Sequence, residues 1–555
     1  MHRKLSSSEM ASERGFRLQK QLFRALLIQF LVPIILEYIP CVAVFFLPLT
    51  GGDFNLEWAT LAVSSYPIFE PLVVIYFVKQ HPHDSHTTEV KRSNAGVSRD
   101  TVSEDCLYLN VWSPNLQGLL PVFLFIHGGA YETGAASVYD AKAFRENFAR
   151  RGIVVVTIQY RLGQFGFLTL NDSVITPNLG LWDQTLGLQW IQDNIGKFGG
   201  DSKRVTIMGE SAGSESVSQL TISPKTQHLF QQAIQMSGTS IGAAARGTNT
   251  LTFSANWTSR LGCDLKSDYK TCLQGKTVEE FWKVKENNAW GCGPDDLNWL
   301  GFAPIIDEDF FPKPEDALKT VPKYPTIFGL NQVEGRLFSL EGASIYMSFG
   351  LGPLKWPKYN ESQFVDFVKK FITFKGYTSE ERDQATQDIL SYYERGHDPS
   401  DAKYWVERYV ESYSDWGMNV PVVREAIAKT QAGSPVYAFL MDYDNPTTWP
   451  AGAPAPGSTH SSEFPYTFGM LADFNYTQDD LTVEKYIQDA LVQFIKTGNP
   501  STTAMPWAPF SLENHDFLSL KPKPEMKTDW FGDSYRFWTD YMKKYKYDWI
   551  TYGPW

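Results

Sequence analysis

The stretch "RVTIMGESAGSESVSQL", residues 204–220, places an apolar run in front of a serine that has small neighbours. The apolar or β-branched residues 205–208 predict a strand, and residues 212–220, which lack proline, predict a helix. A tight turn between a strand and a helix strains the serine backbone and exposes its hydroxyl group. Small neighbours are needed because larger side chains would collide. The stretch therefore makes Ser211 a candidate nucleophile, with Glu210 as its acidic neighbour.

The Gly-x-Ser-x-Gly pattern alone does not identify a nucleophile, because it occurs twice, at residues 209–213 and at residues 238–242. The second copy contains Ser240 and follows a strand-like run, residues 233–236, but has no acidic residue at the turn. On these local grounds Ser211 is either a nucleophile or a turn residue between a strand and a helix.

From about residue 105 the chain alternates between predicted strands and predicted helices. The pattern predicts strands at residues 121–126, 153–159, 205–208, 233–236, 326–330 and 436–440. It predicts helices at residues 139–150 and 182–198, the second with an apolar side made of Leu186, Trp190, Ile191, Ile195 and Phe198. This alternation favours a doubly wound, mainly parallel sheet, whose active site lies at the carboxyl ends of the strands.

A serine hydroxyl needs a base, and the base needs a group that orients it. His460 follows the Pro/Gly/Ala-rich loop at residues 450–458 and opens "HSSEFPYTFG", a late loop of the kind that presents a base. Glu334 follows the predicted strand at residues 326–330 and precedes a glycine. The order Ser211, Glu334, His460 is the chain order of an α/β-hydrolase.

Backbone amides must stabilise the oxyanion that forms when a serine attacks an ester carbonyl. "IHGGAYETG", residues 126–134, follows a predicted strand directly and offers small residues whose amides can approach a ligand. The predicted donors are the amides of Gly129, Ala130 and Ala212. The alternative interpretation of the His-Gly-Gly run is an ordinary turn between a strand and a loop.

Seven longer segments stand out along the chain: "SEDCLYLNVW", "FIHGGAYETG", "VVVTIQYRLGQFGFL", "LGLWDQTLGLQWIQDNIGKFGGD", "VTIMGESAGS", "NQVEG" and "HSSEFPYTFG". Together they resemble the type-B carboxylesterase family, which includes cholinesterases and bile-salt-activated lipases. The resemblance covers a domain at residues 99–555 and implies an α/β-hydrolase fold with helical insertions. It also implies that Ser211 is acylated, that Glu334 is the acid and that His460 is the base. Ser237 matches a family serine that supports the acid.

The expected function is hydrolysis of an uncharged or modestly polar carboxylic ester, from a small molecule or a lipid, through an acyl-enzyme on Ser211. This chemistry needs neither a cofactor nor a metal. The alternative is a catalytically silent adhesion or binding member of the same fold, since fold alone does not determine function. The presence of all three catalytic residue types favours the enzyme. Ala130 stands where the family usually has a third glycine.

Composition indicates a globular protein of one or two large domains, with 43% hydrophobic and 20% charged residues among 555. A formal charge of −12 counts against nucleic-acid binding. The sequence does not indicate an oligomeric state.

Cysteines and glycosylation sequons favour the secretory pathway, either the endoplasmic reticulum lumen or secretion. The spacing of Cys263 and Cys272 favours a disulfide, which the family also has at the matching cysteines; two reduced thiols are the alternative. The remaining cysteines are Cys41, Cys106 and Cys292. The sequons are Asn171, Asn256, Asn360 and Asn475, the candidate glycosylation sites.

Residues 1–98 do not match the family, which has β-rich structure before "SEDCLYLN" and a cysteine that bonds the one matching Cys106. Residues 26–49 form an apolar stretch that contains one charge, Glu37, and three prolines. Its length suits a membrane anchor, although its prolines and carboxylate oppose that interpretation. The alternatives are a segment outside the folded domain and an incomplete gene model. Without the family's N-terminal region one wall of the site is absent, which disfavours an acetylcholinesterase.

Overall fold

A computed structural model describes residues 103–286, 300–340, 358–373, 378–394, 403–445, 452–469 and 476–555. All of the described residues lie in one compact unit, residues 83–555. Several predictions lie outside the described residues, namely the segment at residues 1–98 with its apolar stretch at residues 26–49, Cys41, Cys292 and Asn475. The domain boundary expected after residue 98 stays a prediction.

The described domain is built on a nine-stranded sheet with the order β1-β3-β2-β4-β5-β6-β7-β8-β9. The seven central strands, β2 to β8, are parallel to one another, and the edge strands β1 and β9 pair antiparallel with β3 and β8. Their bounds are β1 Leu109–Trp112, β2 Leu120–Ile126, β3 Val154–Ile158, β4 Gly200–Glu210, β5 Gln232–Met236, β6 Thr326–Asn331, β7 Val436–Met441, β8 Phe517–Leu520 and β9 Glu525–Lys527. A second sheet pairs β10 Tyr547–Asp548 with β11 Gly553–Pro554. The predicted α/β-hydrolase class is confirmed.

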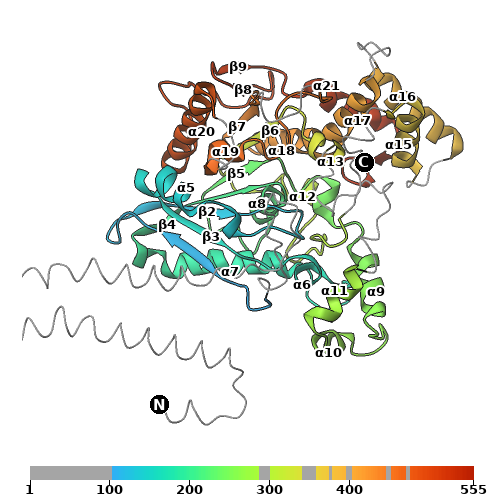
Figure 1. Cartoon of the computed structure of the whole chain (residues 1–555), viewed down its shortest axis with the longest axis horizontal. Coiled ribbons are helices and arrows are strands. Elements are labelled where there is room, and N and C mark those ends of the chain that lie inside the picture. Colours follow the sequence, from blue (N-terminus) through green and yellow to red (C-terminus); the bar gives the residue numbers. More distant parts are fainter. Residues whose placement is uncertain are drawn as a thin grey trace, which may run out of the picture. The chain divides into compact units, whose positions relative to one another are not determined.

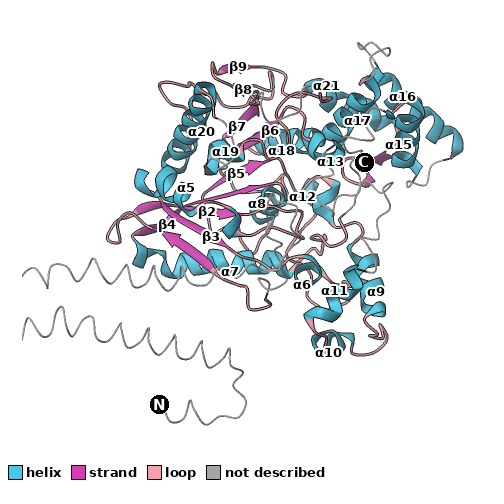
Figure 2. Ribbon diagram, viewed as in Figure 1, coloured by secondary structure: helices cyan, strands magenta, loops and turns pink. Residues whose placement is uncertain are grey.

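Helices cover both faces of the sheet, as Figures 1 and 2 show. On one face the core includes side chains from α7 (Leu179–Asn194), α8 (Ala212–Ile222) and α18 (Val420–Gln431). On the other it includes side chains from the π-helical turn Phe144–Phe148, which follows α5 (Ala141–Ala143), and from α19 (Phe464–Phe468) and α20 (Gln478–Thr497). Strand β2 explains this arrangement, because its side chains alternate between the two cores and are buried on both.

The remaining helices lie around this sandwich. Figure 1 shows α9, α10 and α11 as one group and α15, α16 and α17 as another. Their bounds are α6 Gly163–Phe167, α9 Thr250–Arg260, α10 Tyr269–Gln274, α11 Val278–Glu286, α12 Pro314–Ala317, α13 Gly335–Leu340, α15 Glu361–Thr373, α16 Ser379–Glu394, α17 Tyr404–Ser414 and α21 Gly532–Tyr535.

Two predicted helices differ in detail from the structure. The helix predicted at residues 139–150 begins at Ala141, because the Asp140 side chain accepts a hydrogen bond from the Lys142 amide and caps it. The apolar side predicted for α7 was wrong at Leu186, which is 64% exposed. The buried side of this helix carries Leu188 and Ile191, and a residue two positions before Leu188 points away from it.

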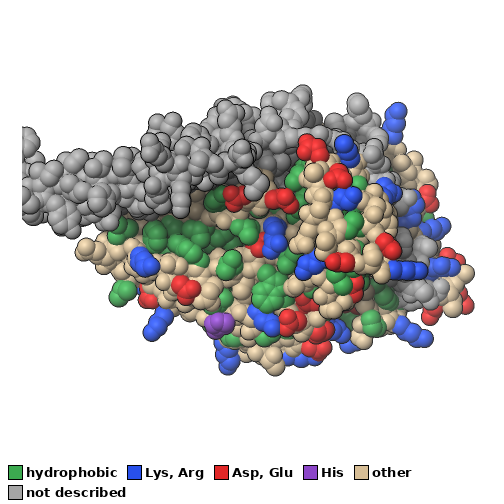
Figure 3. Space-filling view, turned by 90° about the horizontal axis from the view of Figure 1, so that it is seen from below, with side chains coloured by type: hydrophobic (Ala, Val, Ile, Leu, Met, Phe, Trp, Pro, Cys, Tyr) green, Lys and Arg blue, Asp and Glu red, His purple; other side chains and the backbone are tan. Residues whose placement is uncertain are grey.

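The surface mixes charged and apolar side chains. Figure 3 shows one face of the domain on which apolar side chains gather among scattered charges. Within the described ranges, no helix combines the length and the apolar character that crossing a bilayer requires.

Candidate active site

Ser211 occupies the tight turn between β4 and α8. Its backbone angles, φ 56° and ψ −129°, lie in a region that non-glycine residues rarely adopt. A Cβ atom added to Gly209 would lie 2.1 Å from the carbonyl oxygen of Gly213, and one added to Gly213 would lie 2.2 Å from that of Ile126. Only glycine fits at these two positions, so the sequence pattern has a steric cause.

Glu334 and His460 form a buried pair at the carboxyl ends of the strands. Glu334 follows β6, and its Oε2 atom lies 2.7 Å from Nδ1 of His460. Its Oε1 atom accepts hydrogen bonds from the Asn331 amide at 2.7 Å and from Ser237 Oγ at 2.5 Å. These bonds satisfy the buried carboxylate and fix its orientation toward the imidazole.

The two loops that carry this pair are joined by hydrogen bonds. Ser458 donates its backbone amide to Gln332 Oε1 at 3.1 Å, and its hydroxyl accepts from the Gln332 amide at 3.0 Å. The Leu337 amide donates to Thr459 Oγ1 at 2.9 Å. These contacts link residues more than a hundred positions apart and thereby bring His460 beside Glu334.

The second nitrogen of His460, Nε2, is buried and makes no hydrogen bond within the described part of the chain. It lies 3.3 Å from Oε1 of Glu210. The ring of Phe338 packs against the imidazole, with the ring centres 4.9 Å apart. A buried nitrogen with an unused lone pair or proton is equipped to exchange a proton with a group in the cavity.

Ser211, Glu210 and His460 line one cavity of about 250 Å³. No Lys or Arg is among the described residues that line it. Apolar and aromatic side chains form most of the wall: Val138, Tyr139, Ala243, Ala244, Leu300, Leu337, Phe338, Tyr413, Trp416, Met418 and Phe464. The predicted site residues Gly129, Ala130 and Ala212 line the same cavity.

The loop after β2 brings the predicted oxyanion donors beside Ser211. A Cβ atom added to Gly128 would lie 3.1 Å from Cβ of Ser211, so the loop passes directly next to it. Gly129 and Ala130 both have positive φ, 115° and 59°. Among the described residues, no backbone hydrogen bond uses the amides of Gly129, Ala130 or Ala212. These three N–H groups are therefore available to a ligand oxygen.

Buried carboxylates surround His460 and determine its charge. Burial opposes the imidazolium, but Glu210, Glu334 and Glu463 outweigh it and raise the pKa of His460 to about 9. Burial raises the pKa of Glu210 to about 7 and that of Glu463 to about 8. Glu215, which also lines the cavity, has its pKa raised to about 7 by burial. Several of these acids therefore exchange protons near neutral pH.

Three contributors to the site, Ser461, Asn331 and Glu463, were not predicted from the sequence. Ser461 donates its hydroxyl to Glu210 Oε1 at 2.5 Å, and Asn331 Nδ2 donates to Glu463 Oε2 at 2.9 Å. Both partners of each bond lie in or near the quoted motifs, but the sequence does not show that they contact each other, because the contact forms only when the loops fold together. The signal that could have found Glu463 is its place three residues after His460 in "HSSEFPYTFG".

Ser240 and His127 lie close to the site but are not equipped to react. Ser240 is fully buried, and its amide donates to Ser218 Oγ at 2.9 Å. His127 is buried against the ring of Tyr160, and burial lowers the pKa of His127 to about 4. It is therefore uncharged at neutral pH and packs the loop after β2.

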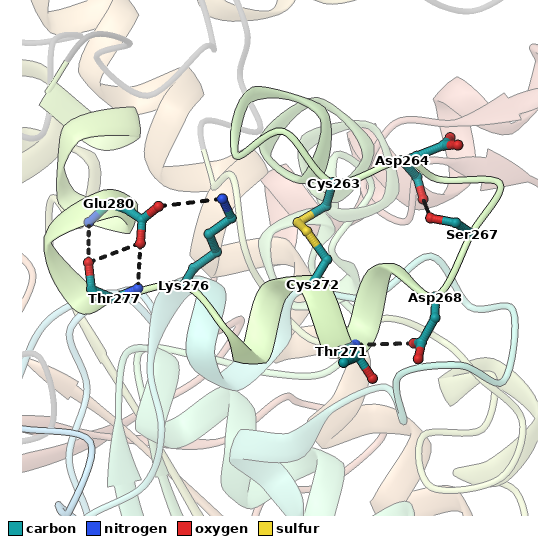
Figure 4. The surroundings of a disulfide bond; sticks show 9 residues. All are labelled: Cys263, Asp264, Ser267, Asp268, Thr271, Cys272, Lys276, Thr277 and Glu280. Atoms are coloured by element: carbon teal, nitrogen blue, oxygen red, sulfur yellow. Dashed lines mark hydrogen bonds and ion pairs between the residues drawn. A yellow bond between two sulfur atoms is a disulfide. The ribbon is translucent and has the colours of Figure 1, made fainter.

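The expected disulfide between Cys263 and Cys272 is present, with Cα atoms 5.7 Å apart (Figure 4). It closes a short polar loop onto α10, where the Asp268 side chain accepts a hydrogen bond from the Thr271 amide at 3.1 Å. Cys106 is a buried free cysteine whose pKa burial raises to about 12. The sequon residues Asn171, Asn256 and Asn360 are exposed.

Comparison with known proteins agrees with this fold and geometry. The family model described as "Carboxylesterase family" matches residues 78–538. Gut esterase 1 of Caenorhabditis elegans is 34% identical over 460 residues, which cover 80% of this chain and 81% of that protein. The chain therefore belongs to the carboxylesterase family and is a carboxylic ester hydrolase.

Two further relatives extend the comparison. Esterase cest-33 of Caenorhabditis elegans is 33% identical over 445 residues, 76% of each chain. The acetylcholinesterase of Bungarus fasciatus is 30% identical over 463 residues, which cover 79% of this chain and 71% of that protein. A separate family model, "Serpentine type 7TM GPCR chemoreceptor Str", matches residues 1–82.

Proposed function

We propose that this hydrolase cleaves carboxylic esters by way of an acyl-enzyme on Ser211. Ser211 Oγ attacks the carbonyl carbon while His460 Nε2 takes the hydroxyl proton, and Glu334 stabilises the resulting imidazolium. The amides of Gly129, Ala130 and Ala212 stabilise the oxyanion. The alcohol leaves with the proton from His460, and water then attacks the acyl-enzyme by the same steps in reverse.

One observation carries this proposal. The imidazole of His460 is bonded through Nδ1 to Glu334 at 2.7 Å and keeps Nε2 free of hydrogen bonds, and it lines the same cavity as Ser211. An orienting acid on one nitrogen and an available second nitrogen is the arrangement that a general base needs. The strained backbone of Ser211 at the end of β4 supports its role as the nucleophile, because such a turn exposes the serine hydroxyl at the edge of the sheet.

The cavity favours an uncharged acyl group. Its wall is mainly apolar, and its titratable groups include the acids Glu210 and Glu215. A carboxylate or phosphate on the acyl chain would have to enter an apolar cavity beside these acids without a cationic partner among the described lining residues. We therefore propose uncharged small-molecule or lipid esters as substrates.

The decisive experiment compares Ser211→Ala with Ser240→Ala. We expect Ser211→Ala to lower the hydrolysis of short p-nitrophenyl esters by about a thousandfold or more, and Ser240→Ala to retain activity within about threefold. A fluorophosphonate probe should label the wild-type protein on the peptide that contains Ser211. Equal activity in wild type and Ser211→Ala would reject the mechanism, and the absence of ester hydrolysis by both proteins would favour a catalytically silent binding protein.

We also propose that the protein follows the secretory pathway. The Cys263–Cys272 disulfide suits an oxidising compartment, and the exposed sequons at Asn171, Asn256 and Asn360 can accept glycans. Removal of N-glycans should shift the electrophoretic mobility of protein made in animal cells, and Asn→Gln at all three sites should reduce the shift. Unchanged mobility would contradict the proposal. Carbonate extraction of membranes would test anchoring through residues 26–49.

A further inference from the structure

The second Gly-x-Ser-x-Gly copy forms the loop after β5, and this loop is anchored inside the protein. The Ser240 amide donates to Ser218 Oγ of α8 at 2.9 Å, and the Ser240 hydroxyl lies 2.8 Å from the same oxygen. Ser240 is fully buried and is not among the described residues that line the cavity. In the second copy of the pattern, the serine therefore attaches the loop after β5 to α8.

A buried carboxylate from α18 holds this loop. Glu425 accepts hydrogen bonds from Ser218 Oγ at 2.6 Å, from Gln235 Nε2 at 3.1 Å and from the Thr239 hydroxyl. It forms an ion pair with Lys429 Nζ at 2.9 Å, and Lys429 also donates to Gln235 Oε1 at 2.7 Å. Both charged side chains are at most 1% exposed. One ion pair thus joins α8, α18, β5 and the loop.

The same loop contacts both ends of the proposed catalytic array. The Ser237 hydroxyl donates to Glu334 Oε1 at 2.5 Å, and the Ser211 amide donates to the carbonyl oxygen of Met236 at 2.9 Å. A Cβ atom added to Gly238 would lie 2.5 Å from the carbonyl oxygen of Ser211. A displacement of this loop would therefore move the acid and the nucleophile together.

Stability alone is a weak reason for this ion pair. Removing two charges from water is costly, and well-packed apolar residues often replace buried ion pairs without loss. A fully satisfied polar network, in contrast, specifies one arrangement of the elements it joins. Burial opposes the ionisation of Glu425, but Lys429 and the Ser218 and Thr239 hydroxyls outweigh it and hold the pKa of Glu425 below its ordinary value.

We propose that Glu425 and Lys429 are positioning residues for ester hydrolysis, because they fix, through Thr239, the loop that presents Ser237 to Glu334. They do not touch the substrate. The inference rests on the proposed function, since it assumes that Glu334 orients the base.

The first experiment removes both charges together, in Glu425→Gln with Lys429→Met, so that no unpaired charge remains buried. The matched control is Arg424→Met with Asp548→Asn, because Arg424 precedes Glu425 on α18 and its 2.6 Å ion pair joins the helix to the C-terminal segment. Both double variants should lower the melting temperature. Only the first should lower kcat, by about tenfold or more, with KM unchanged within about twofold. A kcat equal to that of the control would overturn the proposal.

The second experiment leaves the ion pair intact and tests the link. Thr239→Val should lower kcat in the wild-type background, but it should add little in a Ser237→Ala background, because both changes break one chain of contacts. Additive effects would overturn the positioning role, and this cycle decides the matter if the charge-free variant does not fold. Wild-type protein that fails to label at Ser211 would overturn the proposed function as well, so the two failures are distinguishable.

Discussion

Replacing Glu210 by Gln should make the protein active at lower pH but should lower its maximal rate, kcat. In the proposed mechanism His460 acts as a neutral base, so activity should rise as the pH passes the pKa of His460. The Glu210 carboxylate lies 3.3 Å from Nε2 and raises that pKa. Its removal should therefore shift the acid limb of kcat/KM to lower pH. The same change removes a carboxylate that stabilises the imidazolium in the transition state, so the plateau value of kcat should fall.

The size of the shift follows from the distance. Two unit charges 3.3 Å apart interact by about 5 kcal/mol at an effective dielectric constant of about 20. That energy corresponds to a pKa change of up to about 3–4 units for a fully ionised carboxylate. Burial raises the pKa of Glu210 to about 7, so near neutral pH only part of the population carries the charge. We therefore expect the acid limb to move down by about 1–2 pH units, and kcat to fall about tenfold.

The assay is the pH profile of kcat and kcat/KM for a neutral p-nitrophenyl ester between about pH 5 and pH 9.5, at constant ionic strength. Glu215→Gln is the matched control, because Glu215 is a buried acid of the same cavity but is not one of the main causes of the pKa of His460. It should move the acid limb by less than about half a unit. An acid limb in Glu210→Gln that stays in place or moves to higher pH would refute this electrostatic reasoning.

Two further substitutions test the scaffold. Replacing Cys263 and Cys272 together by Ser should lower the free energy of unfolding by about 2–3 kcal/mol, because the disulfide no longer restricts the unfolded chain. The value of kcat should stay unchanged. Denaturant unfolding measures the loss, and unchanged stability would count against a native disulfide. Gly213→Ala should lower kcat/KM by about tenfold or more, because its Cβ would lie 2.2 Å from the carbonyl oxygen of Ile126 and displace the turn at Ser211. Ester hydrolysis by this variant at the wild-type rate would show that the turn tolerates a side chain.

The sequence was sufficient where a local steric or topological rule applied. Positions 209 and 213 require glycine, because any side chain there would collide with backbone atoms. The Gly-x-Ser-x-Gly pattern could therefore be interpreted without coordinates. The pairing of Glu334 with His460 could be expected from chain order, because parallel strands bring their carboxyl ends to one edge. These rules depend on the backbone, which the strand and helix pattern determines.

Contacts between side chains of distant loops could not be predicted in the same way. Ser461 reaches Glu210 across 251 positions, and nothing in either segment indicates the partner. The exposure of Leu186 was not predicted for a related reason. An apolar residue at the border of the apolar side of a helix can be buried or exposed, and only the packing partner of the helix decides which. Short edge strands such as β1 and β9 also carry too few residues for a periodic pattern.

The two Gly-x-Ser-x-Gly copies follow neighbouring parallel strands, yet they build opposite structures. At Ser211 the helix begins with the next residue, so the chain has no room to relax and the serine is held in a strained conformation at the cavity wall. At Ser240 the chain first runs through residues 237–239, and this extra length lets the serine turn inward onto α8. The number of residues between the strand end and the serine thus distinguishes Ser211, the proposed nucleophile, from Ser240, which anchors its loop. The Ser211 amide donates to the carbonyl oxygen of Met236, the last residue of β5, so the strand that precedes the buried copy also holds the turn at the cavity wall.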